Sequence, residues 1–239
     1  PWNKGVVTNE QDAREHGKAI GYPLMIKASA GGGGRGIRIV RKPDELPELF
    51  RSAAAEARGA FGDDRLFMEK MVQGGRHIEV QIVADQHGTV VALGCRDCSV
   101  QRRHQKVLEE APPSGLPPLM LRALKESAAG LARTAGYVGA GTVEFLVQGP
   151  DFFFLEMNPR LQVEHGITEE ITGTDLVQLQ IRIARGEHLP PLDLQERGFS
   201  IEARVCAEDP DAGFLPAPGR IARFDPALGP RLRIDTGVA

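Results

Sequence analysis

The stretch TVEFLVQGPDFFFLEMNPRLQVEH at residues 142–165 decides the fold prediction, because two strands, a turn and a polar loop follow one another in it. Thr142–Val147 and Phe152–Met157 have the short, apolar, β-branched and aromatic composition of strands. Gly149-Pro150-Asp151 between them is a turn sequence. The pattern therefore predicts a β-hairpin that leads directly into a polar loop.

Two glutamates lie on the two strands of this predicted hairpin. If the turn is symmetric about Pro150, Glu144 and Glu156 oppose each other, with Cβ atoms about 4.5–5.5 Å apart. Two like charges that close repel unless a cation lies between them, and Mg²⁺ prefers such hard oxygen ligands. Asn158 points to the same side and adds a neutral oxygen. The sequence therefore predicts a magnesium site, with an asymmetric turn and one solvated glutamate as the alternative.

The loop after the hairpin packs Arg160, Gln162, Glu164 and His165 into six positions. An arginine can bind a small oxyanion with two parallel hydrogen bonds, so Arg160 is a candidate anion ligand. Glu164 is placed to act as a base toward a group that Arg160 holds. An ordinary charged turn is the alternative, and the position of the loop directly after the predicted metal strand favours the functional interpretation.

Nearer the N-terminus, a glycine loop at Gly31–Gly36 lies between two predicted strands, Leu24–Lys27 and Ile37–Arg41. A P-loop, and a dinucleotide-binding fingerprint as well, would need a helix after the glycines. A glycine hairpin can instead close over phosphates with its backbone N–H groups, and Lys27 can reach a phosphate as a point charge. The alternative is a mobile surface hairpin.

The hydrophobic periodicity and the turn residues of the rest of the chain predict a fold with both helices and strands. Two lobes are expected, a small α/β lobe at 1–72 and a larger, antiparallel-sheet lobe at 73–239, which together give an α+β class. The further elements expected are a helix opened by a capping box of Thr8 and Gln11 and closed at Gly21, helices Pro43–Arg58, Leu119–Thr134 and Asp175–Arg185, and strands Leu66–Glu69, His77–Ala84, Thr89–Gly94, Phe199–Ala207 and Arg231–Asp235.

Composition excludes several classes of function. The chain has 239 residues, a net charge of −3, 41% hydrophobic and 26% charged residues, which is typical of a globular protein without a basic, nucleic-acid-binding field. No run approaches 18 apolar residues, so no membrane span is expected. Three cysteines build no disulfide framework, and a reducing compartment is the default. Because the chain starts at Pro1 and stops in an expected strand, it is interpreted as an excised segment.

Two further motifs have weaker meanings. The basic run Arg102–Lys106 is followed at once by Glu109 and Glu110, which favours a local phosphate or carbonate site over nucleic-acid binding. Cys95 and Cys98 have metal or redox spacing, but no second cysteine pair exists to complete a zinc site, and both fall on a strand. His77 opens a strand near the lobe boundary, where it could face a cleft or serve as a structural histidine.

With a glycine loop, a metal hairpin and an anion loop in this order, the sequence resembles the ATP-grasp superfamily, and more narrowly the biotin carboxylase component of biotin-dependent carboxylases. The resemblance covers essentially the whole chain. It implies that residues 1–72 form a glycine-flap lid lobe and that residues 73–239 form the catalytic sheet lobe, which runs into a truncated biotin carboxylase C-terminal domain. The matching stretches are KASAGGGGRG at 27–36, RDCSVQRRHQKVLEE at 96–110, EMNPRLQVEH at 156–165 and AEDP at 207–210.

The resemblance implies a role for each matching residue. The residues implied to contact ATP are Lys27, the glycines Gly32, Gly33, Gly34 and Gly36, the segment residues Glu69, Lys70 and Val72, and His77, Gln101 and His104. The implied Mg²⁺ or Mn²⁺ ligands, for two ions, are Glu144, Glu156 and Asn158. The implied bicarbonate site consists of Lys106, Arg160, Gln162 and the Val163 backbone. Glu164 is the implied base, and Arg204 is implied to hold carboxyphosphate and the biotin enolate.

The implied reaction has two steps. Bicarbonate attacks the γ-phosphate of MgATP, giving ADP and carboxyphosphate; carboxyphosphate then releases CO₂, and its phosphate removes the N1 proton of biotin so that N1 is carboxylated. The implied partners are a biotin carboxyl carrier and a carboxyltransferase domain or subunit, in a parent homo-oligomer of the cytoplasm or the mitochondrial matrix. No nucleic acid or membrane partner is expected.

The sequence departs from the family pattern in three places. The family's N-terminal domain and the end of its C-terminal domain are not in this chain, and Pro159 and Gly166 replace the expected Thr and Pro around Arg160. Two alternatives stay open. One is another ATP-grasp ligase that makes an acyl phosphate from a different carboxylate, and the other is a module that holds MgATP without turnover.

Overall fold

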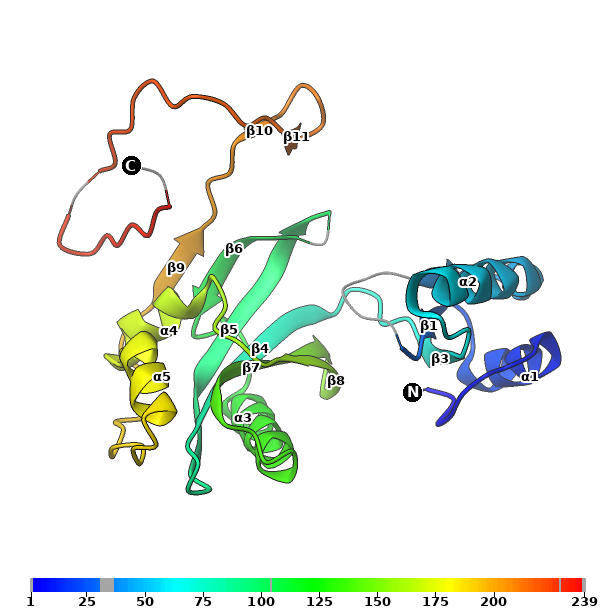
Figure 1. The fold of residues 1–239 in the computed structure, drawn as a ribbon, viewed down its shortest axis with the longest axis horizontal. Coiled ribbons are helices and arrows are strands. Elements are labelled where there is room, and N and C mark those ends of the chain that lie inside the picture. Colours follow the sequence, from blue (N-terminus) through cyan, green and yellow to red (C-terminus); the bar gives the residue numbers. More distant parts are fainter. Residues whose placement is uncertain (1, 31–36, 104, 228, 238–239) are drawn as a thin grey trace. The chain divides into compact units, whose positions relative to one another are not determined.

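The computed structural model describes residues 2–30, 37–103, 105–227 and 229–237 (Figure 1). The chain forms two compact units. The first consists of residues 1–76 with 146–153, and the second of residues 77–145 with 154–239. The sequence places the lobe boundary after residue 72, close to this division, and the assignment of the two lobes as a lid and a catalytic lobe stays a prediction.

The first unit packs two helices against a small antiparallel sheet of order β2-β1-β3. Its core joins apolar residues of β1 and β3, such as Ile26 and Met68, to Phe50 and Ala53 of the long helix. The elements are α1 (Glu10–Ile20), β1 (Leu24–Ala28), β2 (Arg38–Val40), the 3₁₀ turn η1 (Pro43–Glu45), α2 (Leu46–Phe61) and β3 (Leu66–Lys70).

The N-cap of the first helix lies one residue later than predicted. Asn9, not Thr8, is the N-cap of α1, and its side-chain oxygen accepts the backbone N–H of Asp12 at 2.9 Å. Both residue types cap helices well, so the sequence alone did not separate the two neighbours. Gly21 closes the helix as predicted, with φ of 78°, a conformation that glycine adopts without strain.

The second unit is built on a six-stranded sheet of order β8-β7-β4-β5-β6-β9. The pairs β4–β5, β5–β6 and β6–β9 are antiparallel, which agrees with the expected α+β class. The elements are β4 (Arg76–Ala84), β5 (Val90–Arg102), β6 (Gln105–Ala111), α3 (Pro118–Thr134), β7 (Gly139–Gln148), β8 (Asp151–Asn158), α4 (His165–Thr172), α5 (Leu176–Ala184) and β9 (Ser200–Ala203).

Two helices cover opposite faces of β5. Cys95 contacts the carbonyl of Leu121 on α3, whereas the next residue, Arg96, donates to the hydroxyl of Thr168 on α4. Successive side chains of a strand point to opposite faces. Every residue of β4 from Ile78 to Ala84 is therefore buried, and the polar residues of that strand face protein on the α4 side instead of water.

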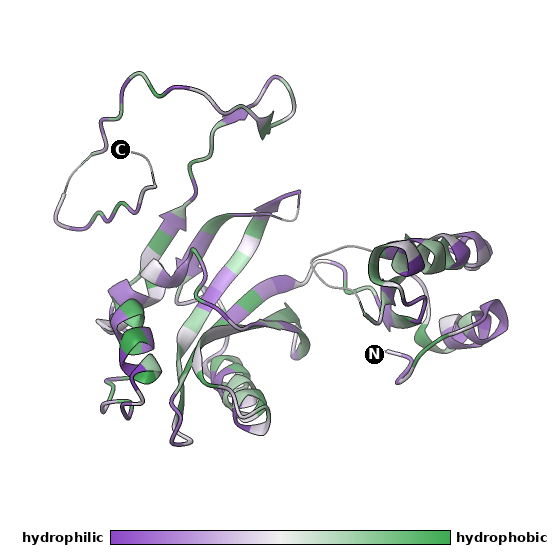
Figure 2. Ribbon diagram, viewed as in Figure 1, coloured by the Kyte–Doolittle hydropathy of each residue, from purple (hydrophilic) through white to green (hydrophobic). Residues whose placement is uncertain are grey.

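Part of the apolar core of the second unit lies between the sheet and α5. Val83 and Leu93 pack there with Leu176 and Leu179 of α5, and the apolar residues of that helix are green in Figure 2. Asp175 caps α5 by accepting the backbone N–H of Gln178 at 2.7 Å. This packing and the cap hold α5, the second helix after the polar loop, against the sheet.

After β9, the only regular elements among the described residues are the short strands β10 (Glu208–Asp209) and β11 (Leu215–Pro216), which pair with each other. The strand predicted at Arg231–Asp235 is wrong, because this segment has no regular secondary structure and Arg233 instead forms ion pairs with Glu169 and Asp235. Apolar alternation alone does not make a strand without a partner to pair with. Within the described ranges, no helix has the length and apolar composition of a membrane span.

Candidate functional site

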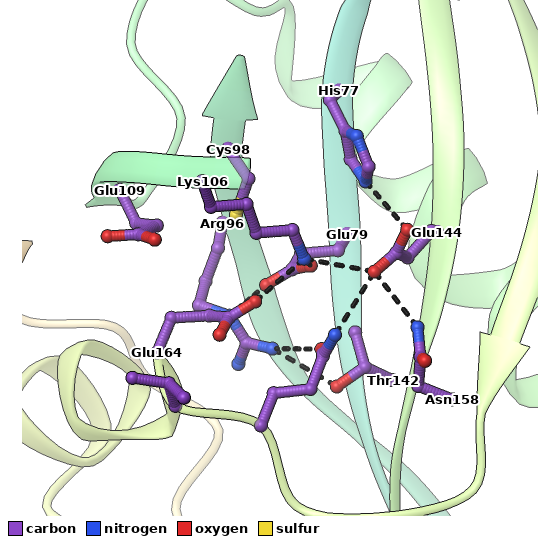
Figure 3. A network of polar contacts seen from close by, with 12 residues as sticks. His77, Glu79, Arg96, Cys98, Lys106, Glu109, Thr142, Glu144, Asn158 and Glu164 are labelled. Atoms are coloured by element: carbon purple, nitrogen blue, oxygen red, sulfur yellow. Dashed lines mark hydrogen bonds and ion pairs between the residues drawn. The ribbon is translucent and has the colours of Figure 1, made fainter. Parts of the chain in front are cut away.

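A cluster of charged side chains lies on the α4-facing side of the sheet of the second unit, and Lys106 is at its centre (Figure 3). The Nζ atom of Lys106 donates to Glu79 at 2.5 Å, to Glu144 at 2.9 Å and to Glu164 at 2.7 Å. Burial alone would lower the pKa of Lys106, but these carboxylates outweigh it and raise the pKa, so the ammonium keeps its charge.

Glu144, on β7, accepts hydrogen bonds from several side chains of the cluster. Its Oε1 atom receives Asn158 Nδ2 at 2.9 Å and Gln162 Nε2 at 3.1 Å in addition to Lys106. Its Oε2 atom lies 2.9 Å from His77 Nε2, which is close enough for an ion pair. The two atoms are not aligned for a hydrogen bond. Burial would raise the pKa of Glu144, but His77 and Lys106 outweigh burial and hold it at about 2.

Glu164, directly before α4, is held by two cations. Its Oε1 atom accepts Lys106, and its Oε2 atom accepts Arg204 Nη2 at 2.7 Å. The Nε atom of Arg204 in turn donates to Glu109 on β6, also at 2.7 Å. Both oxygens of the predicted base are thus paired with charges that could equally bind an anion.

Glu109 and Glu202 form a pair of carboxyls beside Arg204. The register of β6 and β9 places them directly opposite each other, and the Oε2 atom of Glu109 is buried without a hydrogen-bond partner among the described residues. Burial, followed by the charge of Glu109, raises the pKa of Glu202 to about 7. Arg204 is therefore shared by more carboxyl groups than one guanidinium can neutralise.

The structure brings together most of the predicted site residues that lie in the second unit. Gln101 Nε2 lies 3.0 Å from His77 Nδ1, which links two of the predicted nucleotide ligands to Glu144. His104 lies outside the described residues. The side chain of Arg160 is exposed and donates to the carbonyl of Leu161 at 3.2 Å, and Val163 is 61% exposed.

Glu156 is exposed on β8, the strand next to that of Glu144. Among the contacts found between described residues, it takes no part in the hydrogen bonds and ion pairs of the Lys106 cluster. Its role as a metal ligand therefore stays a prediction. The same holds for the assigned roles of the other site residues.

The predicted nucleotide residues of the first unit lie on β1 and β3 or just after them. Lys27 forms an ion pair with Glu69 on the neighbouring strand. Lys70 donates to the carbonyl of Tyr22 at 2.9 Å, and Val72 packs near Gly75. The glycines Gly32, Gly33, Gly34 and Gly36 lie outside the described residues.

Three residues of the cluster are absent from the residue-based predictions. Glu79 lies on β4, and Arg96, from β5, is fully buried and donates to it at 2.6 Å. Thr142 accepts from Arg96 at 3.1 Å. The available signal was a glutamate and a glutamine inside an otherwise apolar strand, because a buried carboxylate requires a cationic partner.

The cysteine pair lies in an environment unlike that of a reactive thiolate. Cys95 and Cys98 are both buried on β5. Burial raises the pKa of Cys95 to about 12 and raises the pKa of Cys98 as well. Protonated thiols are poor nucleophiles and poor metal ligands.

The residues around Glu144 fit a divalent cation. Ligand atoms of His77, Glu79 and Glu144 lie within 4.8 Å of one another, and Glu144 is ionised. Asn158 donates its amide nitrogen to Glu144, and its oxygen accepts only a long hydrogen bond from Arg160 Nη2 at 3.5 Å among the contacts of the described residues. Lys106 bonds to two members of the first group, Glu79 and Glu144, and also to two members of a second group, Glu79, Cys98 and Glu164. The third member of the second group is a buried thiol whose pKa is raised, so the Glu144 side suits a cation better.

Comparison with known proteins identifies the family. Residues 1–192 match the family model "Carbamoyl-phosphate synthase L chain, ATP binding domain", and residues 202–239 match "Biotin carboxylase C-terminal domain". A biotin carboxylase of Nostoc sp. is 52% identical over an alignment of 241 positions, which covers 100% of this chain and 54% of that protein. The propionyl-CoA carboxylase alpha chain of Ruegeria pomeroyi is 51% identical over 97% of this chain and 35% of its own.

Solved structures agree with the sequence comparison. The biotin carboxylase of Campylobacter jejuni, in a complex named "beta-gamma-ATP", has a TM-score of 0.89 and 45% identity over 96% of this chain and 52% of that chain. The biotin carboxylase domain dimer of Hydrogenobacter thermophilus 2-oxoglutarate carboxylase, with MgADP, ADP and bicarbonate, has a TM-score of 0.87 and 45% identity, over 96% and 51% of the two chains. The chain spans about half the length of the first curated relatives. It belongs to the family of the carbamoyl-phosphate synthase L chain ATP-binding domain and, within the ATP-grasp fold, to the biotin carboxylases.

Proposed function

We propose that this chain carries the catalytic site of an ATP-dependent biotin carboxylase, which uses bicarbonate and passes through carboxyphosphate. The observation that carries the proposal is the position of Lys106, which bonds at once to a candidate metal ligand, Glu144, and to the candidate base, Glu164. One cation thus joins the place where ATP phosphates would be neutralised to the place where bicarbonate would lose its proton.

Glu144, Asn158 and Glu156 would hold the divalent ions. Bound there, Mg²⁺ or Mn²⁺ would neutralise charge on the phosphates of ATP. Lys27 in the first unit would add a further positive charge for the phosphates, with Gly32–Gly36 over them. Glu69, Lys70 and Val72, together with His77, Gln101 and His104, complete the proposed nucleotide contacts.

The anion site explains why Glu164 is paired with two cations. An arriving bicarbonate would compete with Glu164 for Lys106 and Arg204, since a small oxyanion takes the same charge-assisted hydrogen bonds. Arg160, the Gln162 amide and the Val163 backbone would complete the binding of the anion. Displacement of one cation would free an oxygen of Glu164 to accept a proton, so substrate binding itself would prepare the base.

The chemistry then follows two balanced steps. Glu164 takes the bicarbonate proton while a bicarbonate oxygen bonds to the γ-phosphorus and the bond from that phosphorus to ADP breaks. Carboxyphosphate next loses CO₂ as its C–O bond breaks, and the phosphate released takes the N1 proton of biotin. The N1 electron pair forms the new bond to CO₂, and Arg204 would hold the enolate oxygen of biotin during this step.

The partners proposed are a biotin carboxyl carrier and a carboxyltransferase, in a homo-oligomeric parent. Among the relatives, acyl-CoA carboxylase subunits and a pyruvate carboxylase are named, and the Hydrogenobacter domain is described as a dimer. The compartment proposed is the cytoplasm or the mitochondrial matrix, and mitochondrial forms are among the named relatives.

The test is ATP hydrolysis with Mg²⁺ in the protein with whatever chain naturally flanks these 239 residues, without bicarbonate, with bicarbonate, and with biotin added. The proposal expects hydrolysis that requires bicarbonate and that biotin stimulates. Hydrolysis that another carboxylate supports and bicarbonate does not would instead favour a different ATP-grasp ligase. Nucleotide binding without any turnover would favour the binding-module alternative.

A further inference from the structure

Arg96 lies at the centre of the second unit, and the proposed reaction does not use it. It is 0% exposed on β5, between Glu79 and the loop that precedes α4 (Figure 3). Burying a guanidinium without complete pairing is costly. An arginine in this position therefore needs an acceptor for each of its donors.

The five N–H groups of Arg96 have five acceptors. Nε donates to Glu79 at 2.6 Å. Nη1 donates to Gln81 and to Thr168, each at 2.8 Å. Nη2 donates to Thr142 at 3.1 Å and reaches Gln162 Oε1 at 3.5 Å. The partners come from β4, β7, the polar loop and α4, so one side chain ties these four segments together.

The contact with Glu79 acts on Lys106. Arg96 occupies Oε1 of Glu79, and Lys106 occupies Oε2. Glu79 is therefore held between two cations, and its second oxygen sets where the ammonium of Lys106 lies.

The contact with Gln162 acts on the polar loop. An arginine side chain has only hydrogen-bond donors, so it cannot accept a hydrogen bond from the amide N–H groups of Gln162. The amide is therefore oriented with its oxygen toward Arg96. The amide nitrogen of Gln162 then points to Glu144, to which it donates at 3.1 Å. The bond to Thr168 on α4 holds the helix that directly follows the loop.

We propose that Arg96 is a positioning residue for bicarbonate, which sets Lys106 through Glu79 and sets the amide of Gln162 directly, without contacting the substrate itself. This inference rests on the proposed function. It predicts an effect on bicarbonate that a purely structural arginine would not have, since both groups that Arg96 orients belong to the proposed bicarbonate site.

The first variant is Arg96→Lys, which keeps the charge but lacks the planar fork of five donors. The expected result is a KM for bicarbonate raised at least tenfold, with the KM for MgATP within twofold of the unsubstituted protein. Thr172→Val is the matched control, because Thr172 is a buried threonine of α4 that donates to the carbonyl of Thr168 and does not contact Arg96. It should leave both KM values unchanged.

A second variant covers the case in which Arg96→Lys does not fold, as judged by circular dichroism. Thr142→Val with Thr168→Val keeps Arg96 and its bond to Glu79 but removes the hydroxyls that hold both Nη atoms. The expected result is a KM for bicarbonate raised at least threefold, again with the KM for MgATP within twofold.

An unchanged KM for bicarbonate in a folded variant would overturn the inference, and so would an equal rise of both KM values. The unsubstituted protein, assayed beside the variants, separates this failure from that of the proposed function. If its ATP hydrolysis does not depend on bicarbonate, the proposed function is wrong, and the positioning role falls with it.

Discussion

The ammonium nitrogen of Lys106 lies 2.7 Å from the Oε1 atom of Glu164. Both oxygens of the candidate base are therefore bonded to cations before any substrate is bound, because Arg204 holds the other one. An anion that takes these cations would free an oxygen of Glu164 to accept a proton, which couples proton removal to the presence of bicarbonate.

Replacing Lys106 by Met should destabilise the protein as well as inactivate it. The change leaves Glu79, Glu144 and Glu164 without their common cation, and an unpaired buried charge costs about 3 kcal/mol. Urea unfolding at pH 7 should show a loss of about this size, together with a fall of at least a hundredfold in kcat/KM for bicarbonate. An unfolding free energy equal to that of the unsubstituted protein would contradict the central position of Lys106.

Glu164→Gln should abolish bicarbonate-dependent turnover and leave MgATP affinity nearly intact, because the amide keeps the shape of the side chain but accepts no proton. Calorimetric titration with MgATP and a hydrolysis assay check the two halves. Glu170→Gln, at an exposed position of α4, the helix that follows Glu164, is the control and should change neither. Equal loss of binding and turnover would remove Glu164 from the role of base.

Lys27→Ala should weaken MgATP affinity, because it removes a point charge predicted to contact the phosphates. It also frees Glu69 from its ion pair, which leaves a carboxylate near the nucleotide and adds to the effect. A tenfold rise in the dissociation constant of MgATP is expected by calorimetric titration. Lys18→Ala, at an exposed position at the end of α1, should leave the affinity unchanged; the same weakening in both variants would show only a general loss of positive charge.

Glu202→Gln should change how stability depends on pH. The pKa of Glu202 in the folded protein is about 7, above its ordinary value of 4.5, so folding favours the protonated form. Its contribution to stability is therefore greatest below about pH 4.5 and is lost as the pH rises to about 7. Glutamine stays neutral and escapes this loss.

Urea unfolding between pH 5 and pH 8 measures the effect. Relative to the unsubstituted protein, the Glu202→Gln variant should gain stability as the pH rises, whereas Glu187→Gln, at an exposed position, should follow the unsubstituted protein. Parallel curves for Glu202→Gln and the unsubstituted protein would mean that Glu202 is ionised throughout this range.

The fold was predictable from the sequence where hydrophobic patterning and turn residues agree. The hairpin around Gly149-Pro150 became β7 and β8, and the helix expected at Leu119–Thr134 became α3 with one residue added. Helix α4 was not expected, because His165–Thr172 is short and follows a charged loop without a capping residue. The expected strand at Arg231–Asp235 failed because strands form through partners, which a local pattern does not reveal.

The candidate site was predictable only in part. The residues of the family motifs, such as Lys106 and Glu164, do lie together, but Glu79 and Arg96 were not recognised from the residues themselves. Alternation along β4 places Glu79 on the face that does not carry the apolar residues, and that face is usually exposed to solvent. Here α4 covers that face, so the glutamate is buried and paired with Arg96. Whether Glu79 is buried depends on the packing of α4, which is distant in the sequence, so the sequence of β4 alone does not reveal it.

The most direct test of the central claim is the formation of labelled carboxybiotin from labelled bicarbonate, biotin and MgATP, compared between the protein and its Glu164→Gln variant. The account predicts one carboxybiotin for each ADP formed under coupled conditions in the unsubstituted protein, and none in the variant. Labelled product from Glu164→Gln at the unsubstituted rate would contradict the role of this base, and ATP hydrolysis without any labelled biotin would contradict the proposed reaction.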